Sequence, residues 1–432
     1  MKFDRVDMNA LERELVSLRR DIHRYPEAGW TEFRTSALII DELQKTGLHV
    51  RFGESIHVKD EMYGMPCSAA LYECEKRAKS ESSRADLIKA MHGGITGCIA
   101  AIEGGRPGPT VGIRVDIDCN EVEESKGQSH RPFREGFRSE HDNLMHACGH
   151  DAHAAIGIGA AKLIHAYKDK LKGKVIIAFQ PAEEGVRGAA SLTKAGHFSG
   201  CDYFFGVHIG LNMTESGSVA ASSTGFLAST KMDVIFKGKS SHAGLRPEAG
   251  RNALAAAATA ALNLLAIPRH SEGASRINVG TLNAGTGRNV IPEKAVMAIE
   301  TRGSTDEINS YMETSAKRIC RSAADMYGCE FEHRFMGKSG TTVCDAPLVE
   351  KTMEILRDVE GIKRVVRETD FGCGDDVTTI MKDVRKHGGM ATEIVLGTPL
   401  SAPHHNGCFD FDEAVIGIGA RVLASLAMGV SN

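Results

Sequence analysis

The chain has 432 residues, of which 42% are hydrophobic and 25% are charged, the composition of an ordinary globular protein. This length exceeds what one hydrophobic core usually organises, so two domains are expected. The formal net charge of −4, with both signs interspersed, excludes the basic surface that binds nucleic acid or an anionic membrane.

The first residues predict an amphipathic helix and not a signal peptide. Met8, Leu11, Leu15, Leu18 and Ile22 are spaced three or four residues apart, and charges interrupt the segment throughout. No other apolar run is long enough to span a bilayer. The eleven cysteines lack paired spacing, which indicates reduced thiols. We therefore expect a cytoplasmic protein.

Short apolar runs alternate with helical stretches such as 152–167, and this pattern predicts an α/β domain. We expect a mostly parallel sheet with helices on both faces, and functional groups beyond the carboxyl ends of its strands. The expected strands are 97–102, 110–115, 174–179, 203–207 and 393–396.

Residues 225–340 predict an inserted domain with the order βαββαβ of a ferredoxin-like module. Ser304 and Glu307 are expected to form a capping box at the start of its long second helix. One face of such a module stays open, so we expect a lid or a dimerisation domain. Residues 1–224 and 341–432 would form the catalytic metal-binding domain. The polar stretch 73–86 predicts a helical excursion or a surface loop.

The densest chemical signal is the segment HACGHDAH at residues 146–153. Three histidines, a cysteine and an aspartate within eight residues are difficult to explain by packing. A thiolate and an imidazole two residues apart, as in Cys148 and His150, can bind one metal ion or two adjacent ones. The alternative is a buried cysteine among surface histidines.

Two carboxylates, Glu183 and Glu184, follow the expected strand 174–179 in the segment QPAEEG. One can bind a metal ion while its neighbour stays free as a general base toward water. A solvated surface pair is the ordinary alternative. The position after a strand favours the functional interpretation, because the backbone at Gly185 can present the two carboxylates differently.

Further polar residues also follow expected strands. His208 ends the strand 203–207, and His404 and His405 lie in a loop after 393–396. A lone histidine is more often a hydrogen-bonded structural residue, but parallel strands would bring these signals to one edge. Asp116 follows 110–115 and is expected to orient a histidine at the site.

Together these motifs resemble the co-catalytic metallopeptidases of the aminoacylase and auxin-conjugate hydrolase type. HACGHDAH, QPAEEG, the strand ending in His208, SHAGLRPEAGRNAL and RNVIP occur in the family's order over essentially the whole chain. SHRPFREGF, HSEGASRINVG and HHNGCFDFDE resemble the family members that cleave p-aminobenzoyl-glutamate, and hydrolases of indole-3-acetyl-aspartate are similar. The resemblance implies amide hydrolysis of an N-acyl amino acid with an acidic amino-acid half.

The resemblance also implies two divalent metal ions per chain, Mn²⁺ or Zn²⁺, with Cys148 bridging them. The other implied ligands are His150, Glu184, His208 and His405. His405 is preferred to His404 because the family pattern His-Asn-x-x-aromatic-Asp begins there. Glu183 is the implied general base, which takes a proton from the attacking water.

The inserted domain is implied to complete the site. His242, in SHAG, would stabilise the oxyanion from across a homodimer, and Asn289, in RNVIP, would hold the substrate. A substrate carboxylate calls for a guanidinium, for which Arg288 and Arg334 are the predicted residues. A surface charge or a salt bridge at a strand end is the alternative for each of them, and the same domain also carries Arg276 and Arg302.

One segment departs from the family, which carries Gly-Ser-Glu-Asp where this chain has Gly-Cys-Gly-Asp-Asp. Asp375 is one methylene shorter than the family's glutamate, and Asp375 or Asp376 is as easily a helix N-cap as a catalytic group. Two alternatives for the whole chain stay open. In the first, the chain is a hydrolase of indole-3-acetyl-aspartate or of N-acyl amino acids and dipeptides in general. In the second, it is a metal-binding subunit that supports a homologous partner.

Overall fold

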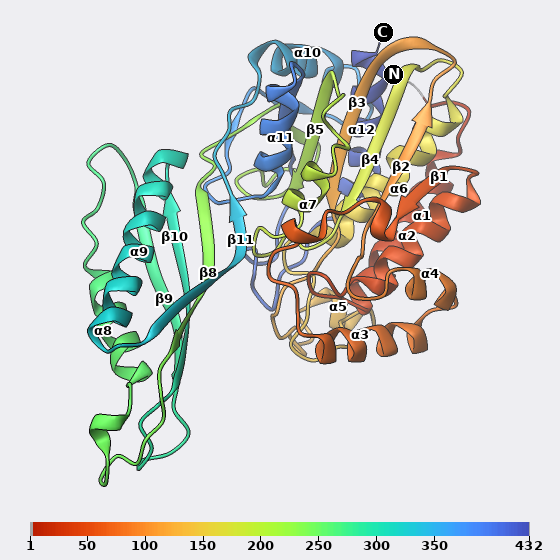
Figure 1. The fold of residues 1–432 in the computed structure, drawn as a ribbon. Helices are drawn as coiled ribbons and strands as arrows, with labels where there is room; N and C mark the ends of the chain where they lie inside the picture. The colour runs from red at the N-terminus through yellow and green to blue at the C-terminus, as the bar shows by residue number, and fades with distance from the viewer. Residues whose placement is uncertain (1–2, 432) are drawn as a thin grey trace. The chain divides into compact units, whose positions relative to one another are not determined.

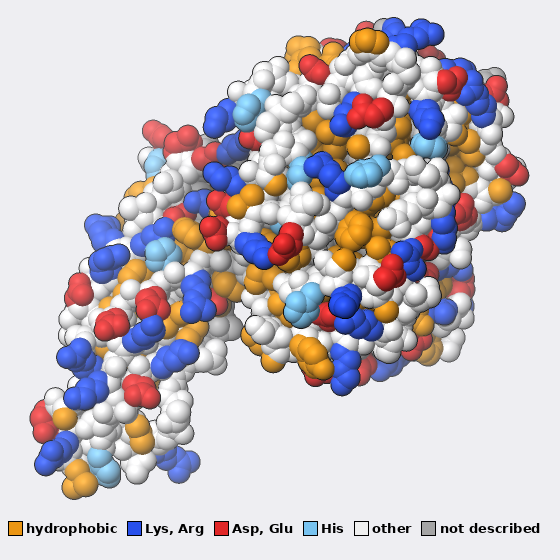
Figure 2. All heavy atoms as spheres, turned by 45° about the vertical axis from the view of Figure 1, so that its right-hand side comes forward, with side chains coloured by type: hydrophobic (Ala, Val, Ile, Leu, Met, Phe, Trp, Pro, Cys, Tyr) orange, Lys and Arg blue, Asp and Glu red, His pale blue; other side chains and the backbone are white. Residues whose placement is uncertain are grey.

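The computed structural model describes residues 3–431, which form two compact units. The second unit comprises Phe226–Thr341 and Cys373–Asp375, and the other described residues make up the first unit. Acidic and basic side chains are interspersed over the face drawn in Figure 2, as the small net charge leads one to expect. Within the described residues, every helix is too short or too polar to cross a membrane.

The first unit is built on an eight-stranded sheet with the order β1-β2-β4-β3-β5-β14-β6-β12 (Figure 1). Its four central strands run parallel and are almost wholly buried toward their carboxyl ends. These strands are β4 (Lys172–Gln180), β3 (Arg106–Asp116), β5 (Tyr203–Ile209) and β14 (Met390–Leu396). The sequences of these strands are continuous apolar runs because both faces of the sheet are covered. The predicted mainly parallel α/β fold is confirmed.

The edges of this sheet are mixed. β1 (His49–Phe52) and β2 (Cys98–Glu103) pair antiparallel with each other, and β2 pairs antiparallel with β4. At the other edge, β6 (Ser218–Ala220) is antiparallel to β14 and parallel to β12 (Arg364–Val366). Two further short strands, β7 (Ser223–Thr224) and β13 (Thr369–Asp370), form a separate parallel pair.

Helices cover both faces of the sheet. α6 (His150–Ala166) packs with α1 (Met8–Arg24) and α12 (Ala414–Val430) on one face, and α7 (Ala189–Lys194) and α11 (Val377–Lys386) lie on the other (Figure 1). The apolar stripe predicted for α1 is buried at Leu11, Leu15 and Ile22. The remaining helices of this unit are α2 (Phe33–Lys45), α3 (Ser68–Glu81), α4 (Ala85–Ala90), α5 (Arg131–Arg134) and α10 (Ala346–Leu356). Most of the polar stretch 73–86 is helical, within α3 and α4.

α1 also carries a fully buried arginine that joins distant parts of the chain. The Arg19 guanidinium donates to Asp151 at 2.8 Å, and to Asp410 and Glu413 at 3.2 Å each. Arg131, from the segment SHRPFREGF, donates to Asp410 as well, at 2.6 Å. Asp151 directly follows His150, so this network fixes the start of α6 against the C-terminal loop.

Arg19→Met is expected to lower the free energy of unfolding by about 3–5 kcal/mol, because it leaves buried carboxylates without their cation. Urea unfolding of the metal-free chain measures this loss. Arg13→Met, at an exposed position of the same helix, is the matched control and should change stability little. Similar stability for the two variants would show that the network contributes no more than a surface charge.

The second unit is a four-stranded antiparallel sheet with the order β11-β8-β10-β9, covered on one face by two helices (Figure 1). Met232, Val234 and Phe236 of β8 alternate toward these helices and form the core with apolar residues of β10. The elements are β8 (Ala228–Lys237), α8 (Ala253–Leu265), β9 (Ser275–Ala284), β10 (Lys294–Gly303), α9 (Asp306–Met326) and β11 (Glu330–Ser339). The predicted order βαββαβ is confirmed.

The predicted capping box of α9 is wrong by one residue. The N-cap is Thr305, whose hydroxyl accepts a hydrogen bond from the Ile308 N–H at 3.2 Å. The backbone of Ser304 is not yet helical in its hydrogen bonding, because its N–H donates to the Ala274 carbonyl, just before β9, at 2.9 Å. The third helical position is therefore Ile308 and not Glu307, and no reciprocal bond of the capping-box type can form.

Candidate metal centre

The chemical signals of the first unit meet at the carboxyl edge of the four parallel strands. Asp116 ends β3, Gln180 ends β4 just before the two glutamates, and His208 is the next-to-last residue of β5. His150 is the first residue of α6, Cys148 lies two residues before it, and the loop after β14 supplies the two C-terminal histidines. The strand order explains this convergence, since carboxyl ends of parallel neighbours share one edge.

Three groups of side chains at this edge that contain Cys148 or Glu184 have ligand atoms within 4.8 Å of one another. The groups are Cys148, Glu184 and His405; Cys148, His208 and His404; and His150, Glu183 and Glu184. Cys148 belongs to two groups and Glu184 belongs to two, so the groups are contiguous. A shared thiolate and a shared carboxylate are the arrangement in which one ligand serves two neighbouring cations.

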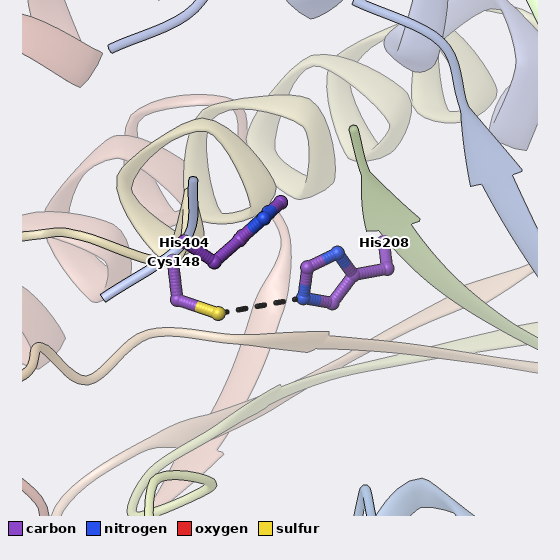
Figure 3. A group of neighbouring side chains, drawn as sticks. All are labelled: Cys148, His208 and His404. Atoms are coloured by element: carbon purple, nitrogen blue, oxygen red, sulfur yellow. Dashed lines mark hydrogen bonds between the residues drawn. The ribbon is translucent and has the colours of Figure 1, made fainter. Parts of the chain in front are cut away.

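His208 is held in the form that binds metals. Its Nδ1–H donates to the Ile209 carbonyl at 2.8 Å, which leaves the Nε2 lone pair directed at Cys148 Sγ, 3.6 Å away (Figure 3). Burial, with His153 and His404 nearby, lowers the pKa of His208 well below its ordinary value. The ring is therefore neutral, as a metal ligand must be.

His150 is oriented in the same way. Its Nδ1 lies 3.0 Å from the Asp118 carbonyl and 3.2 Å from the Asp118 carboxylate, so the proton is on Nδ1. Its Nε2 is buried, makes no hydrogen bond within residues 3–431, and lies 3.9 Å from one carboxylate oxygen each of Glu183 and Glu184. Burial lowers the pKa of His150, but Asp116 and Asp118 outweigh it and raise the pKa to about 10. The site thus has the negative charge that a cation would neutralise.

Glu184 and His405 complete this side of the centre. The Glu184 Oε1 atom is buried without a hydrogen bond from the described residues, and it lies 3.4 Å from His405 Nε2. Burial raises the pKa of Glu184, but His405 and His150 outweigh it and lower the pKa to about 2. Orphaned buried polar atoms are rare in native proteins. Here they belong to ligand-type residues that face one another, so the residues present fit divalent cations.

Asp118, a residue outside the predicted set, connects the two halves of the site. Its two carboxylate oxygens accept the backbone N–H groups of Glu183 at 3.1 Å and Glu184 at 2.9 Å. One of these oxygens also accepts from His150 Nδ1. A single buried carboxylate therefore fixes the predicted ligand His150 and the loop that carries the predicted ligand Glu184 and the predicted general base Glu183. The available signal was the spacing of two aspartates, Asp116 and Asp118, at the end of one strand.

Asp118→Ala is expected to weaken metal binding by about 10–100-fold, the usual effect of removing a group that orients a ligand. Competition with a chromophoric chelator measures the change. Asp142→Ala, at an exposed position of the same unit, is the control. Wild-type affinity in Asp118→Ala would show that the backbone alone holds the ligands in place.

Asp116 orients His153, a histidine that is not among the predicted ligands. Its carboxylate accepts from His153 Nδ1 at 2.5 Å and from Arg114 at 2.8 Å. His153 Nε2 in turn accepts the Ile209 N–H at 3.1 Å, so both ring nitrogens of His153 are engaged and neither is open to a metal. Asp116 is a positioning residue that fixes the end of β5 beside His208.

The loop that carries the glutamates is strained and is held at several points. Ala182 has φ +55°, a left-handed conformation that costs a non-glycine residue about 1–3 kcal/mol. Its N–H donates to the buried Glu32 carboxyl at 2.8 Å. Farther along the loop, the Asp376 carboxylate accepts the Gly188 and Ala189 N–H groups at 3.0 and 2.9 Å. Asp376 thus supports this loop, and its side chain does not cap α11.

Gly149 must be glycine at the start of α6. Its φ is +92°, and a Cβ atom built there would lie 2.6 Å from the Ile209 side chain. This residue turns the backbone between Cys148 and His150, so both side chains reach the same edge of the sheet.

The second unit holds the other predicted residues. His242 Nδ1 accepts the N–H groups of Gly244 and Leu245 at 3.1 Å each, so a neutral ring carries its proton on the exposed Nε2. The Ala243 N–H donates to the Asn289 carbonyl at 3.0 Å, which brings the SHAG and RNVIP segments together. Asp375 is buried and belongs to this unit.

The candidate arginines differ in their surroundings. Arg288 and Arg334 are exposed, and Arg334 lies opposite Asp233 of β8 in the sheet register. Arg302 is paired with Glu300 at 3.0 Å, and Arg276 donates to the backbone carbonyl of Ser275 at 3.0 Å. Arg288 is thus the least constrained of the four by the contacts around it.

Known proteins are similar to this chain in sequence and in fold. Residues 112–429 match the model of the peptidase family M20/M25/M40. The chain belongs to this family. The indole-3-acetyl-aspartic acid hydrolase of Enterobacter agglomerans is 42% identical over 416 residues, which are 96% of this chain and 95% of the relative. One subunit of the p-aminobenzoyl-glutamate hydrolase of Escherichia coli (strain K12) is 42% identical over 422 residues, or 98% and 97% of the two chains.

A solved structure similar to this chain is that of the aminobenzoyl-glutamate utilization protein from Klebsiella pneumoniae. It superposes with a TM-score of 0.84 at 35% identity and covers 99% of this chain and 98% of that chain. The resemblance predicted from the motifs is confirmed. As a member of the family, the chain is a metal-dependent hydrolase of amide bonds.

Proposed function

We propose that this enzyme hydrolyses the amide bond of p-aminobenzoyl-glutamate, releasing p-aminobenzoate and glutamate, with two divalent cations per chain. The observation that carries the proposal is the pair of ligand groups that share Cys148, with Glu183 close by. The names of the similar proteins support the acidic amino-acid half. Mn²⁺ and Zn²⁺ both suit this set of thiolate, imidazole and carboxylate ligands.

The proposed ligands are Cys148, His150, Glu184, His208 and His405. Cations held by them would polarise the amide carbonyl and acidify a water molecule. Glu183 takes the proton of that water and later gives it to the leaving amine. Its placement supports this role, because its backbone is fixed by Asp118 and its carboxylate lies 3.9 Å from His150 Nε2.

The inserted domain is proposed as a lid and as the surface of a homodimer. His242 supports this proposal because its Nε2–H is a donor suited to the negative charge that develops on the carbonyl oxygen. Asn289 and Arg288, adjacent in RNVIP, are proposed to hold the substrate, with Arg334 as a second candidate for its carboxylate. The free state of the eleven cysteines supports a reducing, cytoplasmic location.

Mixing two inactive variants tests the dimer. His242→Ala is expected to abolish turnover while the metal content stays at the wild-type value, because His242 is not among the proposed ligands. Mixing it with an inactive Glu183→Gln variant, after exchange of protomers, should restore activity to about a quarter of the wild-type value, since random exchange gives half heterodimers with one complete site each. No recovery in demonstrably exchanged dimers would place His242 in its own chain's site.

The substrate is tested by measuring p-aminobenzoate and glutamate released by the purified, metal-loaded chain. We expect kcat/KM for p-aminobenzoyl-glutamate to exceed that for p-aminobenzoyl-alanine by at least about tenfold, because an alanine side chain offers no carboxylate to a guanidinium. Faster cleavage of indole-3-acetyl-aspartate would instead favour the activity named for the Enterobacter agglomerans relative. No cleavage of either by the chain with both metals bound would favour a role that needs a second, homologous subunit.

A further inference from the structure

The loop after β14 brings two adjacent histidines into the metal centre, although the family pattern accounts for only one. A ring nitrogen of His404 lies within 4.8 Å of the ligand atoms of Cys148 and His208. The ring centroids of His404 and His208 are 5.5 Å apart. Figure 3 shows the His404 side chain next to the contact between Cys148 and His208.

The backbone explains how neighbours in sequence can reach different ligands. His405 has φ +62°, and its N–H donates to the Ala147 carbonyl at 2.8 Å, which ties the loop to the segment before Cys148. This left-handed residue directs its own ring toward Glu184, at 3.4 Å, while the ring before it stays with Cys148 and His208. A non-glycine residue is rarely left-handed, and such strain is concentrated at functional sites.

The His404 ring is held in place by packing, and one of its nitrogens lacks a hydrogen-bond partner within the described residues. Its ring packs against Phe409, with centroids 4.9 Å apart, so its direction is set by a buried aromatic side chain. Its Nε2 is buried and makes no hydrogen bond within the described part of the chain. A buried ring nitrogen without a partner is costly, and a metal ion is one partner that removes the cost.

We propose that His404 is a ligand of the cation held by Cys148 and His208, whereas His405 binds the cation held by Cys148 and Glu184. One loop then supplies one imidazole to each of two cations on either side of the shared thiolate. This inference rests on the proposed two-metal function and adds a sixth ligand to it.

The test measures metal bound per chain and its affinity, by elemental analysis and chelator competition on the purified full chain. His404→Phe retains a ring against Phe409 and removes both ligand nitrogens. We expect the wild type to bind two Mn²⁺ ions, and His404→Phe to retain one and to bind the other at least about tenfold more weakly. His165→Phe, near the far end of α6, is the matched control and should bind both ions as the wild type does.

Double variants identify the cation that is lost. His404→Phe with His208→Ala should still bind one ion, because both changes affect the same ion. His404→Phe with Glu184→Gln should bind none, because the changes affect different ions. Loss of both ions in the first pair, or one retained ion in the second, would overturn the assignment.

Two ions bound at wild-type affinity in His404→Phe would overturn the inference and leave His404 as a packing residue. The melting temperature of the metal-free variants is the folding control, and His404→Gln replaces His404→Phe if the latter melts lower than the wild type. Fewer than two ions in the wild-type chain would instead overturn the proposed two-metal function itself. The two failures are therefore distinguishable.

Discussion

Glu183→Gln is expected to reduce kcat by roughly 10²–10⁴-fold, the usual contribution of a general base, while both metal ions stay bound. The glutamine amide has nearly the shape of the carboxylate, so the hydrogen bond from the backbone N–H of residue 183 to Asp118 can persist. The amide cannot take a proton from water, however, so the general base is lost. Turnover of p-aminobenzoyl-glutamate and metal content are measured on the same preparation.

The neighbouring residue gives the control for this variant. Glu184→Gln should lose metal, because the Glu184 carboxylate lies in two ligand groups and no other described residue satisfies its Oε1 atom by a hydrogen bond. The two variants then distinguish Glu183, which carries the proton, from Glu184, which binds metal. Equal metal loss in both variants would contradict this division of roles.

Cys148→Ala is expected to remove both metal ions and all measurable turnover. The thiolate is the ligand shared by the groups with His208 and with Glu184, so its loss weakens both positions together. Cys148→Ser should behave similarly, since a hydroxyl is a poorer ligand than a thiolate. Elemental analysis of the purified variants measures the loss.

Cys98→Ala is the matched control, because Cys98 is equally a buried thiol of the first unit but lies in β2 among core residues. It should lower the stability of the fold by a cavity effect and leave the metal content unchanged. A Cys148→Ala variant that retains two ions would show that the thiolate bridges nothing. Retention of one ion would show that it serves a single cation.

The central strands and their functional edge could be predicted because each strand is a continuous apolar run followed by polar residues. β3, β4, β5 and β14 are buried on both faces, and this burial leaves a clear sequence pattern. The edge strands β1 and β12, and β6 next to β12, have only three or four residues each, so no pattern distinguishes them from loops. Their pairings are decided by tertiary contacts.

The details of the site depend on backbone geometry that the sequence does not state. His404 and His405 are adjacent and chemically identical, and a left-handed φ at His405 decides which ligands each one faces. The role of Asp118 arises from hydrogen bonds to backbone N–H groups of a distant loop, at residues 183 and 184, which no side-chain pattern encodes. The cap of α9 is likewise decided by backbone hydrogen bonds. Thr305 is the N-cap because the N–H of Ser304 donates to the Ala274 carbonyl.

The most direct test of a metal-dependent hydrolase is turnover of p-aminobenzoyl-glutamate during stepwise addition of Mn²⁺ to the metal-stripped chain. We expect no turnover in excess chelator, and a rise in turnover that is complete at two ions per chain. A chain that turns over at full rate after chelation, with no bound metal, would contradict a metal-dependent site at Cys148.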